Sequence, residues 1–148
     1  MELSGQPLPS WKVTPLTKEN PPNVEAYFGG YLLILFFSVE CPGCVGRALP
    51  LSRELQLAYP MVNMLGIHTS FKSLKYSIAQ IKGVLRLQAV SYPVYLDQEN
   101  KTYSLYGAEG TPHWLWVNPV GIVEKSIFGS MGNAQQRLWN TLAENFTT

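Results

Sequence analysis

Two cysteines, Cys41 and Cys44, are the residues of this sequence best suited to catalysis. They are its only cysteines, and Pro42 and Gly43 stand between them. A pair at this spacing can close a disulfide, exchange with other disulfides or take part in a metal site. Because one such pair cannot provide a framework of structural disulfides, the spacing favours a reversible two-electron redox switch.

The two sulfurs are expected to play different parts. Pro42 suits the first turn of a helix, where its missing N–H is not needed, so Cys41 would stand at a helix N-terminus. Unpaired N–H groups and the positive end of the helix dipole favour a thiolate there, against an ordinary thiol pKa near ~8.5. We therefore expect Cys41 to attack and Cys44, one turn further in, to be the shielded resolving thiol.

Composition disfavours several other functions. A structural zinc site takes four ligands, and only His68 and His113 remain as nitrogen donors, far from the cysteines, so we expect no metal and no cofactor. The formal net charge of +1 gives no case for nucleic acid or for an anionic membrane surface. The 148 residues, 46% of them hydrophobic, fit one folded domain. The first seven residues lack the basic and apolar regions of a signal peptide, so we expect no such leader here.

Apolar patterns predict the elements that position the cysteines. Residues 31–37 form an unbroken apolar run, which suits a central strand covered on both faces and is too short to span a membrane. Residues 61–68 predict a second buried strand. The helix between them would present Leu49, Leu51, Leu55 and Leu57, and a later helix would present Leu74, Ile78, Ile81 and Leu85. Strand, helix and strand in this order imply a parallel pair joined by a crossover.

The second half of the chain predicts a closing hairpin and a last helix. Residues 92–96 predict an extended segment and residues 101–106 a short helix. Residues 114–117 and 122–128 predict antiparallel strands joined by a tight turn. Asn133 is expected to cap the final helix, whose apolar face would be formed by Leu138, Trp139, Leu142 and Phe146. The prediction is an α/β fold with a mixed central β-sheet flanked by helices.

Four segments together resemble the thioredoxin superfamily, and within it the TlpA-like and DipZ-like thiol-disulfide oxidoreductases, relatives of the AhpC/TSA proteins. They are the strand leading into Cys41-Pro-Gly-Cys44, residues 65–71, residues 92–97 with 103–107, and Gly110-Thr111-Pro112 before a strand and an Asn-Pro-x-Gly turn. The resemblance begins near residue 24. It implies a thioredoxin-like domain over residues 24–148, preceded by an N-terminal extension over residues 1–23.

The extension is rich in proline and predicts mostly loop. A short strand is expected near residues 11–16, and Trp11 is expected to cover an edge of the core.

The resemblance also implies a substrate site and a reaction. A cis Pro112 would face the cysteine pair and turn the backbone of Thr111 toward a substrate segment, whose sulfur would meet Cys41. The implied substrates are disulfide- or thiol-containing proteins, handled through a mixed disulfide. Family likeness further implies an extracytoplasmic bacterial location and a membrane electron donor, while a cytoplasmic location and the direction of electron flow stay open.

The sequence departs from the family pattern around the cysteines. Glu40 stands where thioredoxins have tryptophan, and a carboxylate beside the sulfur disfavours the thiolate. Leu35 replaces the buried acid of thioredoxins, and Arg47 replaces the glutamate common in TlpA-like proteins, so the usual proton-transfer group is missing. Pro42 and Gly43 reverse the order of the thioredoxin motif, which leaves the reduction potential open because ~30 mV is about 1.4 kcal/mol.

Two histidines each allow two interpretations. His68 could shuttle protons near the cysteines, or it could be a strand-end residue paired locally, which is the favoured interpretation. His113 could contact substrate or serve the structure.

Three functions remain. The favoured one is a thiol-disulfide oxidoreductase. A peroxidase of peroxiredoxin type is an alternative, since Ser38 stands three residues before Cys41, although Ile34 replaces the upstream proline of those enzymes. A non-catalytic binding module with a static disulfide is the third.

Overall fold

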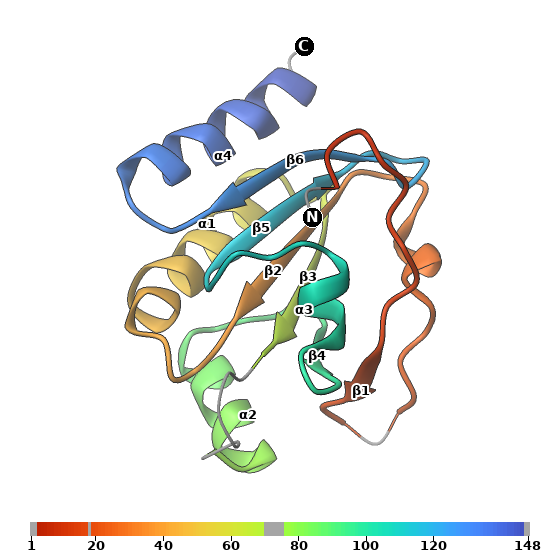
Figure 1. Ribbon diagram of the computed structural model, residues 1–148. Helices are drawn as coiled ribbons and strands as arrows, with labels where there is room; N and C mark the ends of the chain where they lie inside the picture. Colours follow the sequence, from red (N-terminus) through yellow and green to blue (C-terminus); the bar gives the residue numbers. More distant parts are fainter. Residues whose placement is uncertain (1–2, 18, 70–75, 147–148) are drawn as a thin grey trace.

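The computed structural model describes residues 3–17, 19–69 and 76–146. These residues form a mixed six-stranded sheet with strand order β1-β4-β3-β2-β5-β6 (Figure 1). The strands are β1 Val13–Pro15, β2 Leu32–Phe37, β3 Asn63–His68, β4 Val94–Asp97, β5 His113–Val117 and β6 Val123–Phe128. The predicted α/β architecture with a mixed central sheet is confirmed.

Strand β2 lies in the middle of the sheet and sets its directions. It pairs in parallel with β3 and antiparallel with β5, while β3 pairs in parallel with β4. The predicted parallel pair with a helical crossover is therefore confirmed. Phe37 at the end of β2 is the partner of His68 at the end of β3, and Phe36 is the partner of His113 at the start of β5. The residues that follow β2 and those that precede β5 therefore lie close together, at the same end of these two central strands.

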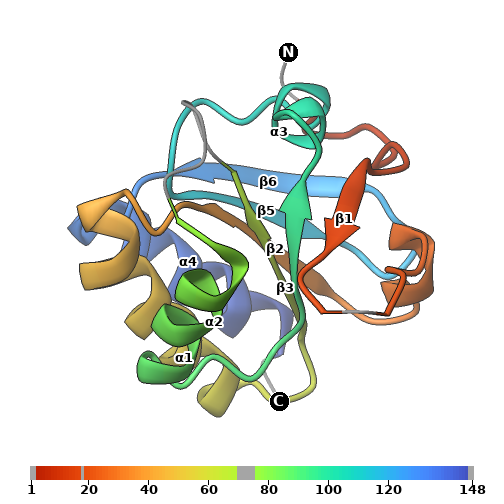
Figure 2. The same ribbon diagram turned by 90° about the horizontal axis from the view of Figure 1, so that it is seen from below.

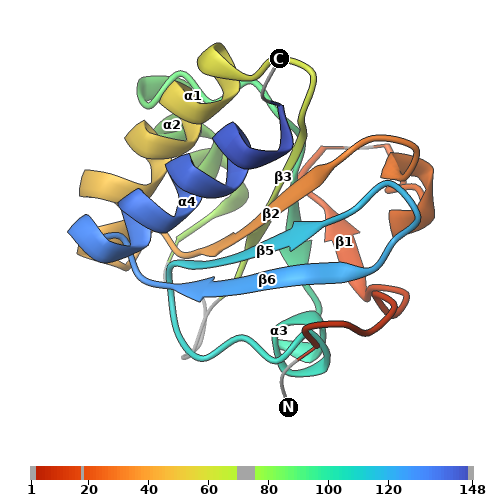
Figure 3. The ribbon, with the colours of Figure 1, turned by 90° about the horizontal axis from the view of Figure 1, so that it is seen from above.

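Helices cover both faces of the sheet. They are η1 Val24–Tyr27, a 3₁₀ turn; η2 Cys44–Ala48, a π-helical turn; and the α-helices α1 Leu49–Ala58, α2 Ile78–Leu87, α3 Lys101–Leu105 and α4 Gly132–Asn145. Figures 2 and 3 show α1, α2 and α4 on one face, with α3 and the N-terminal segment on the other. Because both faces are covered, all six residues of β2 are buried, which is why its sequence is uniformly apolar.

The alternation of side chains along β2 divides the core into two layers. Leu33, Leu35 and Phe37 pack into the layer beneath α1, α2 and α4. Leu32, Ile34 and Phe36 pack into the opposite layer, together with residues of the N-terminal segment and with tyrosines in and just after α3.

The N-terminal segment is part of this folded unit. Strand β1 pairs antiparallel with β4, which confirms the short strand predicted near residues 11–16. Leu3 and Leu8 are buried in the second core layer, and Trp11 packs edge-on against Tyr27 and Tyr95. Trp11 thus covers an edge of the core, as predicted, while a boundary at residue 24 stays a prediction.

Several predicted details were wrong. Leu57 is 75% exposed, because it lies two residues beyond the buried Leu55 and so on the solvent side of α1. Ile78 is 43% exposed in the first turn of α2, whereas Ile81 and Leu85 are buried.

Asn133 does not cap α4. The residue at the N-cap is Met131, whose backbone is extended, and it makes no side-chain capping bond. Asn133 already lies inside the first turn, where its side chain cannot cap the helix. The predicted apolar face is confirmed, since Leu138 and Leu142 are buried.

Strand β3 begins at Asn63, two residues later than predicted, because the turn after α1 continues to Val62, whose N–H bonds to the carbonyl of Tyr59 (3.0 Å). Phe71 and Leu74, which were used in the sequence patterns, lie outside the described residues.

Candidate active site

Cys41 occupies the first position before the helical turns that follow β2. Its own N–H donates to the carbonyl of Ser38 (3.1 Å), and its carbonyl accepts the N–H groups of Cys44 (3.0 Å) and Val45 (3.1 Å). The Cys41 sulfur accepts the N–H of Cys44 as well, at 3.2 Å. The sulfur therefore takes the place of the side-chain oxygen that often caps a helix N-terminus.

The apolar spacing predicts a regular α-helix after the cysteines, but the structure differs in the first turns of this helix. Residues Cys44–Ala48 form a π-helical turn, closed by the Leu49 N–H donating to the Cys44 carbonyl five residues earlier. Pro50 explains this geometry, because it has no N–H and its ring would collide with the carbonyl four residues before it. Such turns are frequent at functional sites. Here the wide turn begins at the second cysteine.

Burial separates the two thiols. Cys44 is fully buried, whereas Cys41 is partly exposed, and both are free thiols. Burial raises the pKa of Cys44 to about 12, with a further contribution from the hydrogen bond to Cys41, while hydrogen bonds from Ser38 and Thr111 act in the opposite direction. Cys44 is therefore protonated at neutral pH, and Cys41 presents the accessible sulfur.

The loop before β5 brings Thr111 and Pro112 to the cysteine pair. The Thr111–Pro112 peptide bond is cis, as the family resemblance implied. The Cys41 thiol donates to the Thr111 carbonyl, with 3.5 Å between sulfur and oxygen across a separation of seventy residues. The structure thus brings Cys41, Cys44, Thr111 and Pro112 together, while their roles toward a substrate stay predictions.

His68 lies behind the cysteine loop and is 2% exposed. Its Nε2 atom accepts the N–H of Val39 (3.1 Å), and its ring meets Phe37 edge-on. Burial lowers the pKa of His68 to about 4, although the negative charge of Glu40 opposes this shift. His68 is therefore neutral at neutral pH and paired locally, in agreement with the favoured interpretation.

Glu40 turns part of its carboxylate into the protein. Its Oε1 atom is buried and has no hydrogen-bond partner among the described residues. Its N–H donates to the Ser38 hydroxyl (3.1 Å), so this hydroxyl is engaged in the backbone of the loop.

Arg47 and Leu35 take the places where the family has acidic groups. Leu35 is fully buried among apolar side chains in the middle of β2. The Nε atom of Arg47 donates to the Ser130 hydroxyl (3.1 Å), which links the cysteine helix to the turn before α4. A Cβ atom on Gly43 would lie 3.0 Å from Arg47 Nη2, so this guanidinium covers Gly43. The sequence did not point to Ser130, because its role depends on a contact between distant segments.

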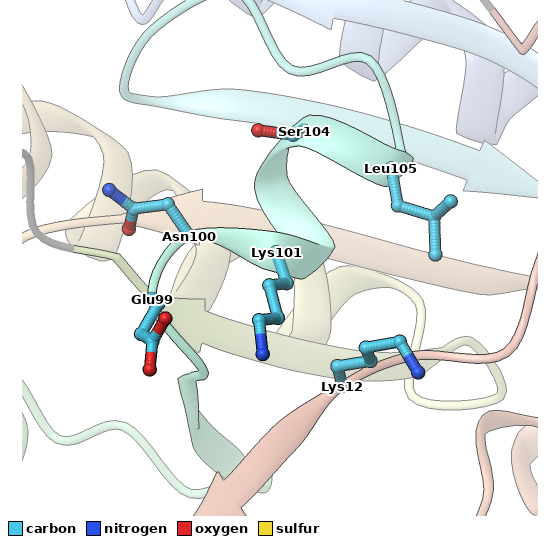
Figure 4. Close-up of a pocket in the computed structure, with 6 residues that line it drawn as sticks. All are labelled: Lys12, Glu99, Asn100, Lys101, Ser104 and Leu105. Atoms are coloured by element: carbon cyan, nitrogen blue, oxygen red, sulfur yellow. The ribbon is translucent and has the colours of Figure 1, made fainter.

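A separate hollow of about 450 Å³ lies beside α3 (Figure 4). It is lined by Lys12, Glu99, Asn100, Lys101, Ser104 and Leu105. None of these residues belongs to the cysteine site.

Within residues 3–17, 19–69 and 76–146, no helix is long and apolar enough to cross a membrane. No three side chains of histidine, cysteine, aspartate or glutamate gather there as metal ligands would.

Solved structures resemble this chain over nearly its whole length. A thioredoxin-like superfamily protein is 24% identical, with a TM-score of 0.82 over 96% of this chain and 97% of that one. The chain has a thioredoxin-like fold. A thiol-disulfide isomerase from Corynebacterium glutamicum is 21% identical, with a TM-score of 0.76 and coverage of 96% and 97%. A secreted Mycobacterium tuberculosis disulfide oxidoreductase, homologous to E. coli DsbE, is 18% identical, with a TM-score of 0.72 and coverage of 93% and 96%.

One of these neighbours is named as thioredoxin-like and the other two for thiol-disulfide chemistry, which matches the resemblance drawn from the sequence at the level of the fold. No protein-family model matches the sequence, and no curated protein matches it either.

Proposed function

We propose that this protein is a thiol-disulfide oxidoreductase that reduces protein disulfides through Cys41 and Cys44. The observation that carries the proposal is the position of the partly exposed Cys41 sulfur. It lies between the Cys44 N–H (3.2 Å) and the Thr111 carbonyl (3.5 Å), at the start of a helix. A sulfur there is accessible to a substrate disulfide, accepts an N–H at a helix N-terminus, and is next to a backbone that an extended substrate can join.

The reaction proceeds in two exchanges. The Cys41 thiolate attacks one sulfur of the substrate disulfide, that S–S bond breaks, a Cys41–substrate disulfide forms, and the other substrate sulfur leaves as a thiolate and takes a proton. Cys44 then loses its proton and attacks Cys41, which releases the second substrate thiol and forms the Cys41–Cys44 disulfide. Two electrons have passed to the substrate. An external dithiol must return the pair to its reduced form.

The buried Cys44 makes the second exchange the demanding one. Its pKa of about 12 means that few molecules carry a Cys44 thiolate at neutral pH. The mixed disulfide with Cys41 should therefore live long enough to be captured. Thr111 and Pro112 hold the substrate chain during this interval.

Structural details favour this function over the two alternatives. A peroxidase of peroxiredoxin type would have a proline upstream of position 38, and Ile34, fully buried in β2, stands there. A purely static disulfide gives no role to the partly exposed position of the Cys41 sulfur next to the Thr111 carbonyl. By likeness to the secreted mycobacterial protein, we further propose an extracytoplasmic bacterial location with a membrane electron donor.

Cysteine variants test the mechanism. Reduced Cys44→Ser protein, incubated with a peptide that contains one disulfide, should accumulate an adduct by one peptide chain, visible by mass spectrometry and removed by dithiothreitol. Cys41→Ser should form none, because Cys44 is buried. Adducts on Cys41→Ser alone would reverse the assigned roles, and adducts on neither variant would contradict the function. The double variant is the control for non-specific capture.

The reduction potential gives the direction of electron flow. Equilibration of the wild type with glutathione should give a value close to the −270 mV typical of thioredoxin, which marks a reductant, whereas a value of about −120 mV would mark an oxidant.

A further inference from the structure

The loop that carries Thr111 to the cysteines lies outside the regular ladders of the sheet. The structure shows two hydrogen bonds to the backbone between Glu109 and Thr111. The Thr111 carbonyl accepts from Cys41 (3.5 Å), and the Glu109 N–H donates to His113 Nδ1 (3.3 Å). The first of these bonds involves the reacting sulfur and is lost when Cys41 enters a disulfide. The second then remains to hold the loop.

His113 is well placed to be a fixed support. It is 1% exposed, and as the first residue of β5 it pairs with Phe36 of β2 and with Phe128 of β6. Its Nε2 atom lies 2.7 Å from the Ser126 hydroxyl. Because Nδ1 accepts an N–H, the neutral ring carries its proton on Nε2 and donates it to Ser126. Both ring nitrogens are therefore engaged, and the ring cannot turn without losing both bonds.

A second side chain, that of Phe128, lies close to the loop. Gly110 has a φ of +154°, and a Cβ atom there would lie 2.6 Å from Cε1 of Phe128. Phe128 is the cross-strand partner of His113, and their rings lie 6.2 Å apart. The segment from Glu109 to Thr111 thus lies against two side chains whose backbones pair in the sheet.

We propose that His113 is a positioning residue for protein substrates: by connecting the Glu109 backbone to Ser126, its ring holds Thr111 in the place where an extended substrate chain pairs. This inference rests on the proposed oxidoreductase function. It assigns His113 to the loop rather than to the reacting atoms, which it does not touch. Loss of the His113 ring should therefore affect some substrates and not others. A substrate that lies along Thr111 needs the support, whereas a small disulfide that reacts only with Cys41 does not.

The test compares two substrates in three proteins. The wild type, His113→Leu and His113→Asn are assayed with a peptide disulfide of about ten residues and with the small disulfide 5,5′-dithiobis(2-nitrobenzoic acid). Leucine keeps the size of the ring and removes both hydrogen bonds. Asparagine offers an amide oxygen near the position of Nδ1 and can accept the Glu109 N–H again. We expect His113→Leu to raise the KM for the peptide about fivefold, the effect of losing one ~1 kcal/mol hydrogen bond, with little change in kcat.

Expressed as a ratio, kcat/KM for the peptide relative to the small disulfide falls about fivefold in His113→Leu and returns to within about twofold of wild type in His113→Asn. An unchanged ratio in His113→Leu would overturn the inference. If kcat/KM fell equally for both substrates, the inference would also be overturned, because the ring would then support the whole site rather than the place where the peptide pairs. A wild type that reduces neither substrate would instead remove the proposed function. Where His113→Leu does not fold, Ser126→Ala is measured by the same ratio, which should fall because the ring loses one of its two anchors.

Discussion

The buried His68 should make the protein lose stability on mild acidification. Its Nε2 atom accepts the Val39 N–H, and protonation of that nitrogen would turn an acceptor into a donor facing another donor. Burial lowers the pKa of His68 to about 4, from 6.5 in an exposed histidine. Between these values the unfolded chain binds a proton that the folded protein excludes, so stability rises with pH across this window.

The size of the effect follows from the two pKa values. Comparing proton binding by the unfolded and folded forms gives a loss of about 2 kcal/mol in the free energy of unfolding between pH 7 and pH 5. The loss reaches about 3 kcal/mol at pH 4 and then levels off, because both forms bind the proton below that point. Since domains of this kind are stable by about 5–15 kcal/mol, the effect is easily measured.

The assay is urea unfolding of the wild type and of His68→Gln between pH 7 and pH 4, followed by tryptophan fluorescence. The glutamine amide oxygen can still accept the Val39 N–H but does not titrate in this range. Subtracting the two stability profiles cancels the contributions of all other groups. The difference should change by about 2 kcal/mol between pH 7 and pH 5. A difference that stays flat would refute the conclusion that His68 is buried in its neutral form.

Further predictions concern packing near the site. Gly110→Ala should lower the free energy of unfolding by about 1–3 kcal/mol, because the backbone angle suits only glycine and the new methyl group would meet Phe128. Gly43→Ala should change the free energy of unfolding by less than about 1 kcal/mol, because the φ of Gly43 is −66° and the nearest atom is the movable end of Arg47. Equal losses in Gly110→Ala and Gly43→Ala would contradict the predicted difference between the two glycines. Tyr92→Phe removes a 2.7 Å bond to a buried serine hydroxyl of α1 and should cost about 1 kcal/mol in urea unfolding, whereas an unchanged midpoint would show the bond to be neutral.

Local patterns predicted the surroundings of Cys41 well. The run of residues 31–37 is apolar throughout because β2 is covered on both faces, and Pro42 does begin the helical turns that place Cys41 at their N-terminus. Both features can be recognised from residue types within a few positions along the chain. The π-helical turn is also local, and Pro50 could have indicated it, since a proline at that point removes a helical hydrogen bond.

Sequence patterns were less reliable where a residue's surroundings are formed by segments that are distant along the chain. Leu57 is as apolar as Leu55, but two residues along a helix place them on opposite sides, and the packing of α1 on the sheet decides which of the two is buried and which is 75% exposed. Asn133 has the chemistry of a helix cap, but the backbone before α4 turns helical too early for it to act as one. In both cases the residue type was compatible with two positions, and the three-dimensional arrangement selected one.

The sequence by itself therefore predicted a candidate redox pair, the strand and helix that carry it, one parallel strand pair and one antiparallel hairpin, because spacing and periodicity act over short distances. Only the tertiary structure showed that the Thr111 carbonyl lies 3.5 Å from the Cys41 sulfur, that His113 accepts the Glu109 N–H, and that His68 accepts the Val39 N–H. Hydrogen bonds across many residues and the loss of solvent depend on which segments pack together. The residue type of a histidine or a cysteine does not by itself predict its hydrogen-bond partners or its burial in the folded protein.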